Sequence, residues 1–380
     1  MRIGFDGRFI TERATGNGVS AQLLLQALAS VDRENEYVIY LLHNGLYLPN
    51  PKFQMKMMRT LHANPQLRFL FTFPRELRRH PVDIFHAIFT VPLLSHTVKP
   101  KIVLTIPEIP WFTDPDSFPG SGLFSAQVRL TTRYSVAKAD CIVTLTEFMK
   151  RQIVSHFSIP EQKVKVIPWG VDEQYFEHRG EEQIEAVKGK FSIRRPYLLS
   201  VGDLHPRKNQ IALVRSYTKL RERYNIPFEL VLVGKPFFKA KQISDCVQDS
   251  SARTSIKLLG YVEARDLPAL YQGAAMFVFP SLHEGFGLPI HEAMASGIPV
   301  ITSNRDTLPE VAGEAALYID PLDEDDIVRT ILRLLEDTTL REQLIKKGVQ
   351  QARRFSWRET AEKTVEVYRE LQRDHRECAA

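Results

Sequence analysis

The chain has little cysteine and no long apolar segment. Its 380 residues include three widely spaced cysteines, Cys141, Cys246 and Cys378, with no Cys-x-x-Cys pair. This usage argues against a disulfide framework and a zinc site, and it fits a reducing, cytoplasmic compartment. No run reaches the roughly 18 apolar residues of a membrane-spanning helix, and the first residues predict a strand rather than a signal peptide. Low-complexity tracts and short repeats are also lacking.

The composition is that of a soluble globular protein of about two domains, with 44% hydrophobic and 25% charged residues. The net charge of +5 is uneven, because residues 1–170 carry 20 Lys and Arg against 13 Asp and Glu, and the remainder carries 30 against 32. The basic excess lies near three phenylalanines, in a group formed by Lys52, Lys56, Arg59, Phe69, Phe71, Phe73, Arg75, Arg78 and Arg79.

This basic, aromatic group has two interpretations. It suits peripheral contact with the inner membrane surface or binding of a phosphorylated acceptor. The alternative is a solvated helix face beside ordinary core aromatics. Nucleic acid is not an expected partner, because the sequence contains no recognised nucleic-acid-binding module.

Short apolar runs alternate with amphipathic stretches in both halves, which is typical of parallel α/β sheets. In the first half we predict strands at 2–5, 37–42, 84–87, 102–105, 141–145 and 164–167, and helices at 18–30 and 125–138. In the second half we predict strands at 197–201, 229–233, 256–259, 276–279, 300–302 and 316–318, and helices at 209–224, 265–272, 290–296, 324–336, 339–353 and 357–374. Two doubly wound domains are therefore expected, with a hinge at 168–172.

The segment 280–297 combines a strand end, a glycine turn and a helix start. Gly285 and Gly287 permit a tight turn that side chains do not crowd. Pro289 fits the beginning of a helix, where its missing N–H costs nothing. The N–H groups and the dipole at such a helix start suit a phosphate or pyrophosphate.

Two carboxylates accompany this turn. Glu284 lies at the start of the loop, and Glu292 is expected in the first turn of the helix. Each can accept hydrogen bonds from vicinal hydroxyls, so one would bind a ribose and the other a sugar. The alternative is that Glu292 only complements the helix dipole and Glu284 caps the turn.

The pattern Glu284-x7-Glu292 around Gly-Phe-Gly-Leu-Pro resembles the signature of retaining glycosyltransferases of family 4, which have the GT-B fold. The resemblance continues in residues 303–313, 318–321 and 355–357 and is strongest from 139 to 357. It implies an α/β protein whose two Rossmann-like domains face each other across a cleft. The N-terminal, acceptor-side domain would cover 1–168, joined by a C-terminal helix at about 357–380, and the nucleotide-sugar domain would cover 169–356.

The resemblance also implies a function. The expected activity is that of a hexosyltransferase, which moves a sugar from a nucleoside diphosphate sugar to a glycan or lipid-linked hydroxyl in polysaccharide or glycolipid biosynthesis. Relatives with a similar sequence in 308–313 are often mannosyltransferases, so GDP-mannose is the first donor expected, followed by UDP-glucose and other UDP-sugars. No cofactor or metal is expected. The alternatives are an epimerase or phosphorylase of the same fold and an inactive nucleotide-sugar-binding protein.

Candidate catalytic residues lie in two loops that follow predicted strands. Arg207 and Lys208, after the strand at 197–201, place two cations where a diphosphate becomes the leaving group. A solvated helix start is the alternative, which the helix dipole disfavours. The resemblance assigns Arg207 and Lys208 to the donor diphosphate. We expect Glu284 to bind hydroxyls of the sugar and Glu292 those of the ribose. Further donor contacts are expected from Gly16, Gly18, Gly202, Gly234, Tyr261, Val262, Gly285, Phe286, Gly287 and Leu288.

The acceptor side departs from the family pattern. Pro107 stands where many relatives have a histidine that contacts the transferred sugar. Glu108 or another group substitutes for that histidine, the acceptor chemistry differs, or activity is reduced. Asn17 is the second acceptor-side candidate. Two Asp-x-Asp patterns, at 114–116 and 323–325, match metal sites only weakly, because two acids so spaced are common by chance.

Overall fold

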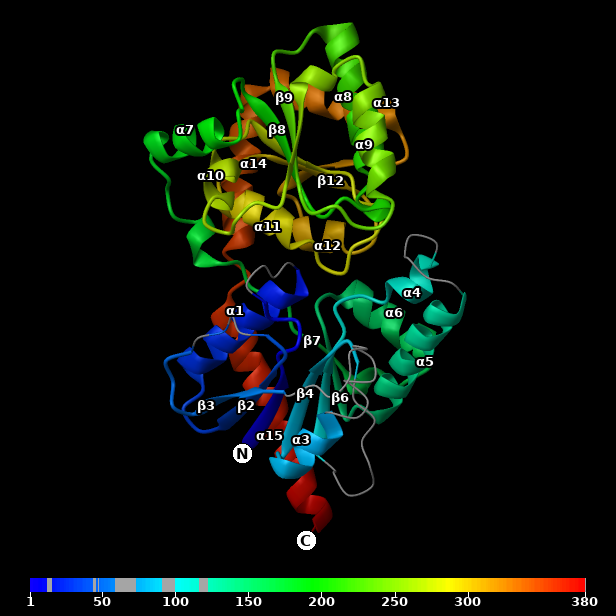
Figure 1. The fold of residues 1–380 in the computed structure, drawn as a ribbon, viewed down its shortest axis with the longest axis vertical. Helices are drawn as coiled ribbons and strands as arrows, with labels where there is room; N and C mark the ends of the chain where they lie inside the picture. Colours follow the sequence, from blue (N-terminus) through cyan, green and yellow to red (C-terminus); the bar gives the residue numbers. More distant parts are fainter. Residues whose placement is uncertain are drawn as a thin grey trace. The chain divides into compact units, whose positions relative to one another are not determined.

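In the computed structural model the chain forms two compact units, each built on a parallel sheet (Figure 1). The structure describes residues 1–11, 16–43, 46, 48–58, 73–90, 100–115 and 122–379. Unit 1 comprises Met1–Trp111, Gly120–Gly170 and Ser356–Ala380, and unit 2 comprises Phe112–Pro119 and Val171–Phe355. Among the predicted features, Arg59, Phe69, Phe71 and Asp116 lie outside the described residues.

Across its described strands, the sheet of unit 1 has the order β3-β2-β1-β4-β5-β6-β7, and every pairing is parallel. The strands are β1 (Arg2–Asp6), β2 (Glu36–Leu41), β3 (Phe53–Met57), β4 (Ile84–Ile88), β5 (Lys101–Thr105), β6 (Cys141–Thr144) and β7 (Val164–Val166). Most are apolar throughout because helices cover both faces of such a sheet. The helices in this part of the chain are α1 (Asn17–Val31), α3 (Phe73–Arg79), α4 (Pro110–Thr113), α5 (Gly122–Lys138), α6 (Glu147–Phe157), the short η3 (Glu161–Lys163) and α15 (Trp357–Ala379).

Helix α15 packs against α1 within unit 1 and is fixed there by buried polar contacts. The Tyr368 hydroxyl lies 2.6 Å from Nδ1 of His86, whose Nε2 lies 2.7 Å from Oγ1 of Thr105. Burial lowers the pKa of His86 to about 3, so the ring is neutral. At the start of the helix, the Thr360 hydroxyl donates to the carbonyl oxygen of Pro168 at 2.7 Å. The last helix is thereby part of the core of unit 1.

The sheet of unit 2 has the order β10-β9-β8-β11-β12-β13 and is also parallel throughout its described pairings. The strands are β8 (Tyr197–Val201), β9 (Glu229–Val233), β10 (Ile256–Gly260), β11 (Met276–Phe279), β12 (Val300–Ser303) and β13 (Ala316–Ile319). The helical segments are η4 (Glu173–Tyr175), α7 (Glu181–Lys190), η5 (Pro206–Lys208), α8 (Gln210–Tyr224), α9 (Ala240–Asp249), η6 (Arg253–Ser255), α10 (Leu267–Gln272), α11 (Leu288–Ala295), α12 (Leu308–Ala312), α13 (Glu324–Glu336) and α14 (Thr338–Ala352).

The order of this sheet determines where loops gather. Helices α8, α9 and α13 pack on one face, and α10 and α11 on the other (Figure 1). Helix α14 contributes to both apolar clusters, through Leu344 and Ala352. The central strand β8 pairs with both β9 and β11, and the strand order reverses there. The loops that follow β8 and β11 therefore leave the same edge of the sheet side by side, at the kind of switch point where α/β sheets bind ligands.

Candidate active site

The loop after β8 delivers Arg207 and Lys208 to this edge. The backbone N–H of Arg207 donates to Nδ1 of His205 at 3.2 Å, which caps the short helix η5. The ring of His205 is buried and stacks on Phe237 with centroids 5.4 Å apart. Burial and the neighbouring charges of Arg207 and Lys208 lower the pKa of His205 to about 4, so it is a neutral capping group.

The loop after β11 ends in the helix α11, as predicted from its glycines. Gly287 precedes the helix and has φ 84°, a backbone conformation that residues with a side chain rarely adopt. A Cβ there would lie 2.9 Å from Cδ2 of Leu308. Helix α11 begins at Leu288, so Glu292 lies in its second turn. The expectation that Glu292 occupies the first turn is therefore wrong, because the helix starts one residue before Pro289.

Backbone and side-chain bonds fasten the two loops to each other. The N–H of Leu282 donates to the carbonyl oxygen of Arg207 at 2.7 Å, and the Ser281 hydroxyl donates to the same oxygen at 3.1 Å. In the other direction, the Arg207 guanidinium donates to the carbonyl oxygen of His283 at 2.9 Å. Polar contacts thus fix the relative positions of the two loops.

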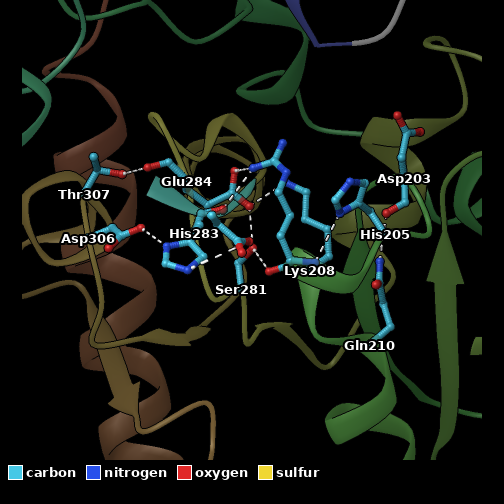
Figure 2. Close-up of polar contacts among 11 residues, drawn as sticks. Asp203, His205, Lys208, Gln210, Ser281, His283, Glu284, Asp306 and Thr307 are labelled. Atoms are coloured by element: carbon cyan, nitrogen blue, oxygen red, sulfur yellow. Dashed lines mark hydrogen bonds and ion pairs between the residues drawn. The ribbon is translucent and has the colours of Figure 1, made fainter. Parts of the chain in front are cut away.

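Glu284 lies at the centre of this junction. Its carboxylate lies 2.5 Å from Nζ of Lys208, 3.2 Å from a guanidinium nitrogen of Arg207 and 2.5 Å from the Ser281 hydroxyl. We call these four residues the Glu284 cluster, and Figure 2 shows Lys208 and Ser281 directed at Glu284. The sequence predicted that the two cations and the carboxylate meet at one site. It did not predict that they form ion pairs with one another.

The electrostatics of the cluster favour the ionised form of Glu284. Burial of Glu284 alone would raise its pKa, but the charges of Lys208 and Arg207 and the bonds from Lys208 and Ser281 hold that pKa below its usual value. The Lys208 ammonium also lies 5.0 Å from the centroid of the Phe279 ring. The cluster is a desolvated carboxylate held between two cations at the edge of the sheet.

Two glycines predicted to contact the donor, Gly202 after β8 and Gly234 after β9, allow the backbone segments to approach each other closely. A Cβ on Gly234 would lie 2.0 Å from the carbonyl oxygen of Gly202. A Cβ on Gly202 would in turn meet the stem of Lys208 at 3.4 Å. Next to them, the Lys235 ammonium lies 4.6 Å from the centroid of Tyr261. The absence of a Cβ at Gly202 therefore lets the backbone at this edge approach the Lys208 side chain closely.

The side chains of three further donor candidates differ in exposure. Tyr261 is half-buried and Val262 is buried. The ring of Phe286 is buried against His291 and Phe355, at centroid distances of 5.2 and 5.8 Å. Phe286 is therefore a core side chain, and only its backbone fits the expected role in binding a diphosphate.

Glu292 has neutral partners, in contrast to Glu284. The Tyr271 hydroxyl donates to its Oε2 at 2.8 Å, and the Tyr175 hydroxyl also bonds to the carboxylate. Part of the side chain reaches the surface, yet dense packing around the carboxyl raises its pKa to about 7. The tyrosine hydroxyls oppose this rise, and the charge of Asp172 adds to it.

Sequence reasoning missed several members of this region. Nδ1 of His283 lies 2.8 Å from Oδ2 of Asp306 (Figure 2). This hydrogen bond is the main cause of the raised pKa of the imidazole. Asp306 has φ 52°, which is uncommon for a residue with a side chain. The Thr307 hydroxyl donates to the carbonyl oxygen of Glu284 at 3.0 Å. His283 lies in the loop after β11, whereas Asp306 and Thr307 lie in the loop after β12, within the segment 303–313 that carries the family resemblance. No role was assigned to them, because their polar side chains resemble those of an ordinary turn.

The remaining site candidates belong to unit 1. Gly16 and Asn17 precede and start α1, and Gly18 is buried in its first turn. Ser20 is not the N-cap residue of this helix. It lies inside the helix and donates to the carbonyl oxygen of Gly16 at 3.1 Å. Glu108 is half-buried in the segment after β5.

The basic, aromatic group is described only in part. Phe73 is buried in the core of unit 1, whereas Arg75, Arg78 and Arg79 are exposed on α3. This part matches a solvated helix face beside a core aromatic. Within the described residues, no helix is both long and apolar enough to span a membrane.

Of the two Asp-x-Asp patterns, the structure describes only the one at 323–325 in full. Asp323 caps α13 by accepting from the N–H groups of Asp325 and Asp326, and Asp325 pairs with Lys219 at 2.9 Å. In the ranges the structure describes, no group of three or more His, Cys, Asp or Glu residues is arranged to hold a metal ion. The acids at 323–325 are explained by helix capping.

Two family models match the chain, "Glycosyl transferases group 1" over residues 182–351 and "Glycosyltransferase Family 4" over residues 16–175. O-antigen chain mannosyltransferase B of Escherichia coli is 33% identical over 278 residues, which cover 73% of this chain and 72% of that protein. The serotype-specific mannosyltransferase WbdA of Escherichia coli is 31% identical over 248 residues, 64% of this chain but only 30% of that protein. The chain therefore spans less than a third of the length of WbdA.

Solved structures share the fold at low sequence identity. Sucrose-phosphate synthase from Thermosynechococcus elongatus has a TM-score of 0.81 at 19% identity, over 98% of this chain and 99% of that chain. Anabaena Alr3699/HepE, solved in complex with UDP and glucose, has a TM-score of 0.76 at 17% identity, over 96% and 98%. The chain belongs to the group 1, family 4 glycosyltransferases, with their GT-B fold, and it is a hexosyltransferase of glycan biosynthesis.

Proposed function

We propose that this glycosyltransferase moves a mannosyl residue from GDP-mannose to a hydroxyl group of a glycan or lipid-linked acceptor, with retention of the anomeric configuration. The observation that carries the proposal is the Glu284 cluster, two cations and a carboxylate beside a glycine loop that starts a helix. Mannose is supported by the similarity to mannosyltransferases. A nucleotide donor is supported by a protein of the same fold that was solved with UDP and glucose.

The cluster suits the departure of a diphosphate. Arg207 and Lys208 would oppose the negative charge that develops on the leaving group, together with the N–H groups at the start of α11. Glu284 contacts both cations and so positions their charges at this site. In the occupied site Glu284 would also accept hydrogen bonds from hydroxyls of the transferred sugar, and Glu292 from those of the ribose.

Retention is proposed to occur on one face of the sugar, without a covalent enzyme intermediate. The bond between the anomeric carbon and the phosphate oxygen breaks on the face where the new glycosidic bond forms. The acceptor hydroxyl loses its proton to an oxygen of the departing diphosphate, so protons and charge balance without a further reagent. Glu284 is tied to two cations and a serine hydroxyl, which suits positioning better than nucleophilic attack.

The acceptor is assigned to unit 1, with Asn17 and Glu108 as its contacts. Pro107, which replaces the histidine of many relatives, is buried next to Glu108. We propose that Glu108 takes over the polar contact that proline does not make. The exposed arginines of α3 fit a peripheral approach to anionic lipid from the cytoplasmic side.

Binding and turnover test the donor assignment. A thermal-shift panel of GDP, UDP and ADP with their sugars should show the largest rise in melting temperature for GDP and GDP-mannose, because a ligand at 100 times its Kd stabilises by about 2.7 kcal/mol. Proton NMR of the product should show the anomeric configuration of the donor. A larger shift with UDP-sugars would overturn the choice of base, and an inverted product would overturn the stereochemistry.

A matched pair of lysine variants tests the cluster. Lys208→Ala should lower turnover by about 100-fold or more, the typical loss when one group that stabilises transition-state charge is removed. Lys219→Ala is the control, since Lys219 also forms ion pairs in unit 2, with Glu324 and Asp325 on α13. The control should keep turnover within about twofold of wild type. Turnover of Lys208→Ala within threefold of wild type would refute the assigned role.

A further inference from the structure

Two buried tyrosines converge on Glu292. Tyr271, on α10, is fully buried and donates to Oε2 at 2.8 Å. Tyr175, on η4, is also buried, and its hydroxyl interacts with the same carboxylate. The two rings pack edge to face, with centroids 5.6 Å apart and planes at 82°. Two segments far apart in the sequence of unit 2 thus supply hydroxyls to one acidic side chain.

Other tyrosines in the described core of unit 2 use their hydroxyls differently. Tyr197 donates to the carbonyl oxygen of Leu270 at 2.7 Å, and Tyr217 to that of Phe228 at 2.7 Å. Those bonds satisfy backbone groups inside the protein. Glu292, by contrast, is half-buried. The tyrosine pair therefore acts on an acidic side chain rather than on a backbone group.

The partners leave Glu292 able to bind hydroxyls. A carboxylate has about four acceptor positions, and two tyrosine hydroxyls use about half of them. Because both donors are neutral, they do not cancel the charge of the carboxylate as the cations around Glu284 do. Two fixed donors also restrict the rotamers of a flexible side chain before binding, which lowers the entropy lost when a ligand is bound.

Local structure fixes Tyr175 itself. The short helix η4 is capped by Asp172, whose carboxylate accepts from the N–H of Gln174 at 3.1 Å and from its side-chain amide at 2.8 Å. Tyr175 follows directly and is buried in the core of unit 2. Its hydroxyl is therefore aimed by the backbone rather than by a flexible loop.

We infer that Tyr175 and Tyr271 are positioning residues that hold the Glu292 carboxylate in the orientation that accepts the vicinal hydroxyls of the donor ribose, and that they thereby set a preference for ribonucleotides over 2′-deoxyribonucleotides. The inference rests on the proposed function, in which Glu292 binds the ribose. It goes further by naming what orients this residue and which feature of the donor is selected.

Calorimetric titration with matched nucleotides tests the inference. The probes are GDP with 2′-deoxy-GDP and UDP with 2′-deoxy-UDP. The wild type should bind the ribose form of its preferred base about tenfold more tightly or better, as expected for a hydrogen bond to a charged group. In the double variant Tyr175→Phe, Tyr271→Phe this preference should fall below about threefold, with affinity for the 2′-deoxy form within about twofold of wild type. Glu292→Gln should show the same loss.

Tyr197→Phe is the matched control. It removes a buried tyrosine hydroxyl that bonds to Leu270, the neighbour of Tyr271 on α10, without touching Glu292. It should keep the full ribose preference whatever its melting temperature. If the double variant does not fold, Tyr175→Phe alone is measured, and its ribose preference should fall at least threefold.

The outcomes separate the inference from the proposed function. A ribose preference in the tyrosine variants equal to that of the wild type overturns the inference, as does an equal loss of affinity for the ribose and deoxyribose forms. The second result would mean that the tyrosines only support the fold. If the wild type binds none of the four nucleotides, the proposed donor is wrong and the inference falls with it.

Discussion

Removing Lys208 should destabilise unit 2 because it leaves a buried carboxylate with less compensation. Glu284 is 8% exposed, and the side chain of Lys208 is 12% exposed. In Lys208→Met, the carboxylate keeps Arg207 at 3.2 Å and the Ser281 hydroxyl at 2.5 Å. Methionine retains most of the apolar stem of lysine, so the change removes mainly the charge.

The size of the effect follows from the geometry. At the 2.5 Å separation of Lys208 and Glu284, an effective dielectric of about 20 gives a gross attraction of about 7 kcal/mol. Desolvation offsets much of this, and removal of one partner of a buried pair typically costs about 3–5 kcal/mol. Because Arg207 remains, we expect about 2–3 kcal/mol for Lys208→Met. Combined with Glu284→Gln in a double-mutant cycle, the coupling energy should be about 2 kcal/mol.

Urea unfolding followed by two probes assigns the loss to the correct unit. Trp111, Trp169 and Trp357 all belong to unit 1, so their fluorescence reports on that unit, whereas circular dichroism reports on both. In Lys208→Met, the transition seen by circular dichroism but not by fluorescence should occur at a lower urea concentration than in the wild type. A coupling energy below about 0.5 kcal/mol would refute the argument and place the pair among weak surface ion pairs.

The pH dependence gives a second check on the same pair. The lowered pKa of Glu284 means that its contribution to stability is present above its unfolded value of about 4.3 and is lost as the pH falls through the folded value. The stability difference between wild type and Lys208→Met should therefore be largest near pH 7 and shrink below pH 4. A difference that grows on acidification would contradict the assigned ion pair.

Three further outcomes are expected. Calorimetric GDP affinity should rise between pH 6 and pH 8 as Glu292, whose pKa burial raises to about 7, becomes a carboxylate, and this rise should be missing in Glu292→Gln. Asp306→Asn should lower the free energy of unfolding at pH 6 by less than about 1 kcal/mol and have little effect at pH 9. The reason is that Asp306 raises the pKa of His283, so the stability that the pair contributes is present below about pH 6.5 and is lost as the pH rises through the folded pKa. Thermal unfolding at the two pH values measures the difference. Gly234→Ala should cost about 3 kcal/mol or more in chemical unfolding, since its Cβ would meet a backbone oxygen at 2.0 Å, whereas Gly189→Ala in helix α7, with nothing within 4 Å, should stabilise by about 0.5–1 kcal/mol.

The fold was largely predictable because buried parallel strands are continuous apolar runs. Strands β8, β9 and β11 begin and end at the predicted residues. Strand β3 was missed because it lies at the sheet edge with Met55 and Met57 exposed, so its composition does not indicate a buried strand. Helix α7 was missed because none of its residues is buried, which leaves no apolar periodicity to detect.

The site was predictable to the extent that strand order dictates it. Arg207, Lys208 and Glu284 follow strands that become neighbours of one sheet, so their meeting could be predicted from the alternation of strands and helices. The tyrosine pair could not, because Tyr175 and Tyr271 have the sequence context of core residues. Their role depends on where two hydroxyls end in space, which no local pattern encodes.

The place of α15 in unit 1 has a consequence for synthesis. During translation, residues 171–355 can complete the sheet of unit 2 while unit 1 still lacks the helix that supplies Val365, Tyr368 and Leu371 to its core. The order in which the chain emerges is thus the reverse of the order in which the two units can finish folding. Until Tyr368 reaches His86, the first-made half of the protein exposes the side of α1 that packs against α15, and transiently exposed apolar surface of this kind is prone to aggregation.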